Sequence, residues 1–94
     1  ITYLDTYAWI LFMKEDYTNA RIYIDRVVKP NLSDEELLKV ENLQGNLIEH
    51  AGDIYAECGS IDTALRYWNL ALLKKDGTCT PLVKKKIKKK KYIK

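Results

Sequence analysis

The chain contains an internal repeat, in which two stretches match when one is shifted by 44 positions along the other. Ala20 then falls on Ala64, and Tyr23 falls on Tyr67. Each stretch has an apolar pattern with helical spacing, a polar break, and a second apolar pattern with helical spacing. Because such helices bury their apolar faces against each other, the sequence predicts an all-α fold of two stacked antiparallel hairpins.

Helix-breaking residues set the expected bounds of the two hairpins. The first hairpin is predicted over residues 2–29 with a turn at 15–16, and Pro30 blocks further helix. The second is predicted over residues 47–74, where Gly59 can adopt the left-handed conformation that ends a helix. Both hairpins and the segments around them are expected to form one domain.

Residues 30–46 form an insert between the two hairpins. A capping box at 33–36 predicts that a helix begins there. The apolar spacing continues beyond it, so we predict one long helix from about 34 to 57, kinked at Gly45. A separate short helix that ends near Leu43 is the alternative.

The last segment, residues 80–93, is predicted to be a capping helix that packs on the second hairpin. Thr80 and Pro81 supply a capping residue followed by proline at the first helical position. Lysines cover most of this helix: Lys84, Lys85, Lys86, Lys88, Lys89, Lys90 and Lys91. Helical stacks need such a polar end-cap, so we expect this segment to be the natural end of a longer parent protein.

These features together resemble the tetratricopeptide repeat (TPR), a helical hairpin of roughly 34 residues with small and aromatic residues in a fixed order. The residues that carry the resemblance are Tyr7, Ala8, Ala20, Ala51, Gly52, Tyr55, Gly59, Ala64, Trp68 and Ala71. Glu15 departs from the family pattern, which has glycine at the turn. The resemblance implies an α-solenoid that acts as a protein–protein interaction scaffold and is not an enzyme.

The chain is similar in particular to the last repeats of bacterial, Bacteroidetes-like TPR proteins, which are often exported or lipid-anchored. That similarity implies a parent protein in the periplasm or at the outer membrane. The residues themselves leave the compartment open.

In the TPR family the first helix of each hairpin lines a concave binding surface. The resemblance places seven residues of this chain there: Asp5, Trp9, Phe12, Met13, Glu49, Asp53 and Glu57. The last three are four positions apart, so they project from one side of a helix and form an acidic strip. Such a surface suits a partner with lysine or arginine and an apolar anchor. The alternative for the strip is three solvated carboxylates that bind nothing.

The first helix also predicts self-association, because residues 7–13 are apolar on every side of it. Trp9 and Phe12 would then pack against a preceding repeat or a second copy of the chain, giving a homodimer. This alternative competes with their use in binding a ligand.

The lysines support a second possible function. Residues 1–83 carry 8 basic and 13 acidic residues, a net charge of −5, whereas residues 84–94 contain eight lysines. Such a segment could bind an anionic membrane surface or nucleic acid. The lysines surround the helix, and only Tyr92 could stack on a base, so the pattern favours a solvated cap.

The sequence predicts no catalytic residue, metal site or cofactor. His50 is the single histidine, and it lacks the two-histidine spacing of a helical zinc site. We expect it to be a packing or hydrogen-bonding residue. Cys58 and Cys79 are predicted to be free thiols, and the acidic residues near Cys58 are expected to raise its pKa.

Overall fold

The computed structural model describes residues 2–41 and 43–93, and this part of the chain contains six helices and no strand. The helices are α1 (Thr2–Met13), α2 (Tyr17–Ile24), α3 (Asp34–Lys39), α4 (Gly45–Glu57), α5 (Ile61–Lys74) and α6 (Val83–Lys89). The prediction of an all-α fold is therefore confirmed. The molecule measures 30 × 29 × 22 Å along its principal axes.

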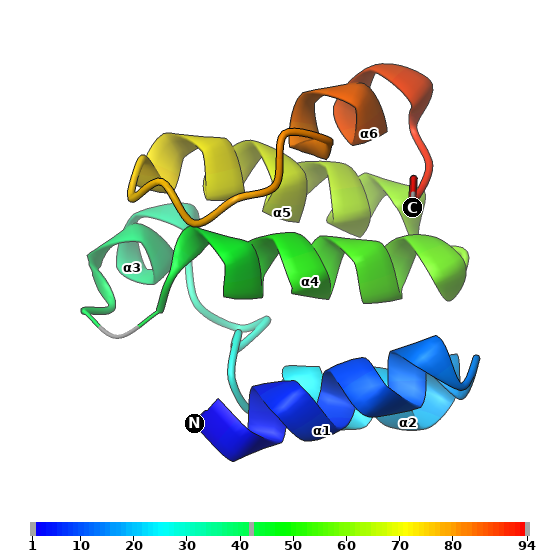
Figure 1. Cartoon of the computed structure of the whole chain (residues 1–94). Helices are drawn as coiled ribbons and strands as arrows, with labels where there is room; N and C mark the ends of the chain where they lie inside the picture. The colour runs from blue at the N-terminus through cyan, green and yellow to red at the C-terminus, as the bar shows by residue number, and fades with distance from the viewer. Residues whose placement is uncertain (1, 42, 94) are drawn as a thin grey trace.

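The helices form two hairpins, and two further helices, α3 and α6, pack on the second hairpin (Figure 1). α1 pairs with α2, α4 pairs with α5, and α2 packs against α4 to join the two hairpins. α3 packs on one part of α5, and α6 packs on another. The second hairpin therefore lies in the middle of the molecule, between the first hairpin and α6.

Small residues allow α4 and α5 to approach closely. Gly52, Ala51 and Ala64 are buried, and a Cβ atom added at Gly52 would lie 2.5 Å from two atoms of the Trp68 indole. Trp68 itself is fully buried. The glycine thus makes room for the largest side chain of the core. Gly59 has a φ of +88° and ends α4, in agreement with the sequence prediction.

The other residues of the TPR pattern also lie mainly in the core. Ala8, Ala20, Tyr55 and Ala71 are buried, whereas Tyr7 is exposed and contacts Tyr23 edge-on. The hydroxyl of Tyr55 on α4 donates a hydrogen bond of 2.6 Å to Asp25, which follows α2. Burial, and next this bond, raise the pKa of Tyr55. This bond adds a polar contact between the two hairpins.

The predicted single helix over residues 34–57 is wrong, and two helices replace it. The capping box is present, with Ser33 Oγ accepting from Glu36 N at 3.2 Å and Glu36 Oε1 accepting from Ser33 N at 3.0 Å. Yet the helix it starts ends at Lys39, because Val40 has extended backbone angles. The alternative of a separate short helix is correct, and that helix ends before Leu43.

Side chains distant in the sequence explain this interruption. Lys74 Nζ donates hydrogen bonds to the carbonyl oxygens of Leu38 and Val40, at 2.9 and 2.8 Å. These bonds satisfy carbonyl groups at the end of α3 that have no partner within the helix. Asp76 accepts a 2.8 Å hydrogen bond from the amide of Gly45 at the start of α4. Thr78 Oγ1 accepts a 2.9 Å bond from the next amide in that helix. The last residue of α5 and the loop after it therefore cap the two ends that a continuous helix would not have.

The turn between α1 and α2 holds Glu15 in the left-handed region, with a φ of +63°. This conformation is unfavourable for residues other than glycine. We expect Glu15→Gly to raise the free energy of unfolding by about 1 kcal/mol, measured by urea denaturation. Lys14→Gly, which changes the preceding residue, should not stabilise the chain. A Glu15→Gly variant less stable than the wild type would contradict this prediction.

α6 begins later than predicted. Its first helical residue is Val83, and the side chain of Thr80 accepts from the amide of Leu82 at 3.3 Å without capping a helix that starts at Pro81. Val83 and Lys86 are the buried residues of α6. The helix ends at Lys89, and the φ of +55° at the next residue, Lys90, turns the chain back toward the body.

Candidate functional site

The predicted acidic strip is not a surface feature over most of its length. Glu49 is fully buried and Asp53 is 1% exposed, so both the ligand-binding and the solvated interpretation are wrong for these two residues in this structure. Glu57, one turn further on, is exposed. The physical reason is that Lys86 of α6 and Thr80 before it are bonded to these carboxylates.

Lys86 forms the centre of a buried ionic cluster. Its ammonium group lies 2.7 Å from Glu49 Oε2, 2.9 Å from Asp53 Oδ1 and 3.0 Å from Asp53 Oδ2. The side chain of Lys86 is only 3% exposed, so these are contacts in a low-dielectric interior. The prediction that the lysines form a solvated cap is therefore wrong for Lys86.

Each carboxylate of the cluster has a further partner. The Trp68 indole nitrogen donates a 3.0 Å hydrogen bond to Asp53. The amide of Thr80 donates to Glu49 Oε1 at 2.8 Å, and its hydroxyl donates to Glu49 Oε2 at 2.5 Å. The cluster therefore links α4, α5 and the segment of α6 through hydrogen bonds that satisfy buried charges.

The two carboxylates differ in acidity. Burial raises the pKa of Asp53 to about 6, although Lys86 and Trp68 oppose this shift. Burial also acts to raise the pKa of Glu49, but the hydrogen bonds from Lys86 and Thr80 outweigh it and lower that pKa. Burial disfavours the charged form of Lys86, yet the two carboxylates raise its pKa overall.

Asp53 should give the stability of the chain a pH dependence that Asp53→Asn removes. Because its pKa rises from 3.8 to about 6 on folding, the folded chain keeps a proton that the unfolded chain releases. The stability from this group is complete below pH 3.8 and falls as the pH rises through about 6. Between pH 4 and pH 7, the free energy of unfolding of the variant should rise by about 2 kcal/mol relative to that of the wild type. Urea denaturation across this range tests this, and a constant difference would contradict it.

The aromatic residues predicted for the concave face divide into buried and accessible ones. Phe12 is buried, so the prediction of an exposed Phe12 is wrong, although its ring lines a pocket. Trp9 is partly buried and stacks on Phe12 at 4.7 Å and on His50 at 4.0 Å. His50 Nδ1 lies 3.4 Å from Asp5, so this histidine packs and forms a polar contact, as its sequence context predicts.

Three other side chains form the exposed apolar face of α1. Tyr7 and Ile10 are each 46% exposed, and Met13 is 57% exposed. They recur every three residues and so lie along one side of the helix. Of the aromatic and apolar residues predicted to bind a partner, Met13 is the one on this face.

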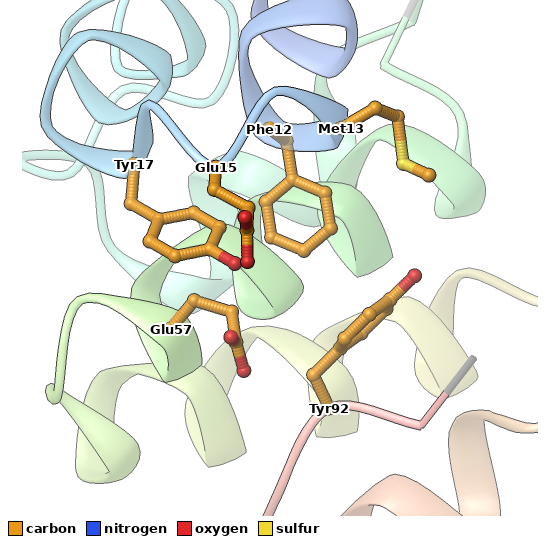
Figure 2. A pocket seen from close by; sticks show the side chains of 6 residues that line it. All are labelled: Phe12, Met13, Glu15, Tyr17, Glu57 and Tyr92. Atoms are coloured by element: carbon orange, nitrogen blue, oxygen red, sulfur yellow. The ribbon is translucent and has the colours of Figure 1, made fainter.

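A pocket of about 450 Å³ lies at the end of this face. Its walls are Phe12, Met13, Glu15, Tyr17, Glu57 and Tyr92. Figure 2 shows Glu57 and Tyr92 facing Phe12, Glu15 and Tyr17 across the pocket, with Met13 at its edge. The pocket therefore joins three predicted site residues with three that the sequence did not indicate.

Six of the seven lysines predicted as an anion-binding patch are exposed. They are Lys84, Lys85, Lys88, Lys89, Lys90 and Lys91. Lys86 is the exception, and its position gave a signal: it lies three residues after buried Val83, on the same side of the helix. Thr80 and Tyr92 could not have been assigned in this way, because their contacts depend on how α6 docks.

The cysteines do not resemble reactive thiols. Cys58 and Cys79 are free cysteines, and burial is the main factor that raises both pKa values, to about 11 for Cys79. The predicted direction for Cys58 is correct, but burial exceeds the effect of its acidic neighbours.

Within residues 2–41 and 43–93, no group of three or more histidine, cysteine or acidic residues could hold a metal ion. In the same part of the chain, no helix has both the length and the apolar character needed to cross a membrane.

Comparison with known proteins gives no relative. No protein-family model matches the chain, and no curated protein or solved structure is significantly similar to it. The function is therefore argued from the geometry above.

Proposed function

We propose that the chain is a protein–protein interaction module of the TPR type, and that it binds rather than catalyses. The observation that carries the proposal is the open pocket at the end of α1, continuous at Met13 with the exposed apolar face of that helix. A concave pocket beside exposed apolar side chains is typical of a surface that binds another protein. The tight packing of Gly52 against Trp68 supports the TPR-type hairpin.

Selection from a random peptide library displayed on phage tests this proposal. We expect the wild-type chain to enrich peptides that bind with micromolar affinity, and Met13→Glu to weaken them at least tenfold. Leu73→Glu is the matched control, because Leu73 is 58% exposed, Met13 is 57% exposed, and Leu73 lies on α5 away from the pocket. Failure to enrich any peptide, or equal loss with both variants, would count against an interaction site on α1.

Self-association through α1 is the other form of this proposal. Ile10 is exposed at the centre of the apolar face, so Ile10→Glu should convert a dimer into monomers. Light-scattering chromatography at several concentrations measures the mass directly. A wild-type chain that is monomeric at every concentration would contradict self-association, and the exposed face of α1 would then bind a different protein.

A second candidate function rests on the six exposed lysines near the end of the chain. Such a cluster would attract an anionic membrane surface at about 1 kcal/mol per lysine. Binding to vesicles that contain phosphatidylserine should then fall steeply between about 50 and 200 mM salt. Replacing Lys84, Lys85 and Lys88 by alanine should weaken it by about 3 kcal/mol, and salt-independent binding would contradict this function.

A further inference from the structure

We propose that the pocket at the end of α1 binds the cationic side chain of a lysine or arginine on a partner protein. This inference rests on the proposed function, and it adds the chemistry of the partner. The pocket combines aromatic rings with carboxylates around an open volume of about 450 Å³.

Aromatic rings form three sides of the pocket. The ring of Phe12 lies 5.4 Å from that of Tyr17 and 5.0 Å from that of Tyr92, measured between centroids. The Phe12–Tyr92 pair is perpendicular, and the Phe12–Tyr17 pair is tilted by 57°. Rings at different angles around one space allow a cation to lie against more than one π face.

Two carboxylates give the pocket a negative charge. Glu15 reaches it from the turn after α1, and Glu57 reaches it from the last turn of α4 (Figure 2). Neither forms an ion pair with any residue in the described ranges. Burial raises the pKa of Tyr17, and the charges of Glu57 and Glu15 raise it further, so both carboxylates act on the same space.

The exposed side chain of Met13 extends the pocket toward the face of α1. A lysine side chain has an apolar stem and a charged head, so it could place methylene groups against Met13 and its ammonium between the carboxylates. A volume of about 450 Å³ is within the range of binding pockets for small groups. An anionic side chain would be repelled by the two carboxylates, and a neutral one would form no ion pair with them.

NMR titration of the wild-type chain with Nα-acetyl-lysine methylamide tests this directly. We expect the amide signals of Glu15, Tyr17, Glu57 and Tyr92 to shift with a Kd of roughly 1 to 10 mM, as suits one side chain. The arginine derivative should behave alike. The norleucine derivative, which has the apolar stem but no ammonium, should cause no saturable shift. Equal binding of norleucine would overturn the proposal.

Variants separate binding from folding. Glu57→Gln should raise the Kd about fivefold or more, and Glu35→Gln, an exposed carboxylate on α3, should leave it unchanged. Glu15→Gly removes the other carboxylate while relieving its left-handed backbone, so weaker binding there cannot result from lost stability. A Kd unaffected by Glu57→Gln and Glu15→Gly would overturn the site.

The peptide selection distinguishes this inference from the proposed function. Enriched peptides with a lysine or arginine, and with affinity lost on Glu57→Gln, would support both. Enriched peptides without a basic residue would keep the interaction module and overturn the cationic pocket. The pocket signals could also shift when the protein concentration alone is raised, and return to their original positions in high salt. That result would show that lysines of a second copy occupy the pocket, and it would overturn the proposal that the partner is a different protein.

Discussion

Lys86→Met is expected to lower the free energy of unfolding by about 3 to 5 kcal/mol, the cost of leaving buried charges without their partner. The ammonium of Lys86 is the cation within 3.0 Å of both Glu49 and Asp53, and both carboxylates are buried. A domain of this size has only about 5 to 15 kcal/mol of stability, so the variant should be close to unfolding. Urea denaturation at neutral pH measures the loss.

Lys85→Met is the matched control, since Lys85 is the exposed neighbour of Lys86 on the same helix. Its effect should stay within about 0.5 kcal/mol. Adding Glu49→Gln and Asp53→Asn to Lys86→Met should recover much of the stability, because the remaining buried groups are then neutral. A Lys86→Met variant as stable as the control would contradict the buried position of this ion pair.

Gly52→Ala is expected to lower the free energy of unfolding by about 2 to 3 kcal/mol. In the middle of a helix, glycine to alanine normally stabilises by about 1 kcal/mol, so a loss shows steric conflict. The added Cβ would lie 2.5 Å from Cδ1 and Nε1 of Trp68 and 3.2 Å from the carbonyl oxygen of Ala64. Trp68 cannot move aside, because it is fully buried and bonded to Asp53.

A double mutant identifies the cause of this loss. Trp68→Leu removes both atoms that the alanine would meet, so Gly52→Ala should cost much less in that background. The coupling between the two substitutions should exceed 1 kcal/mol in urea denaturation. Additive effects, or a Gly52→Ala variant more stable than the wild type, would mean that α4 and α5 do not approach this closely.

The parts of the fold that could be predicted depend on residues close together in the sequence. Gly59 ends a helix through its own backbone, and the capping box at 33–36 begins one through neighbours three residues apart. The close approach at Gly52 is also visible in the sequence, because small and large residues recur at helical spacing. Such local signals are sufficient to predict the helical hairpins.

The parts that could not be predicted depend on partners more than thirty residues away. Helical spacing alone predicts one continuous helix over residues 34–57. Lys74 instead bonds carbonyl groups at the end of α3, and Asp76 bonds the first amide of α4, so the helix is divided in two. The sequence predicts a solvated Lys86, since a lysine is rarely buried unless a paired charge is supplied by another element. That pairing also removes Glu49 and Asp53 from the candidate surface, which moves the site toward Glu57 and Tyr92.

The position of Tyr92 ties the pocket to the docking of α6. Tyr92 follows α6 by three residues, and the ammonium of Lys86 lies 5.2 Å from the centre of its ring. If α6 leaves the body, the pocket loses this wall. Any ligand that contacts Tyr92 therefore binds more tightly to the docked form, and reciprocity requires that ligand to hold α6 in place with the same free energy. Protection of the α6 amides from hydrogen exchange would then report on an occupied pocket elsewhere in the molecule.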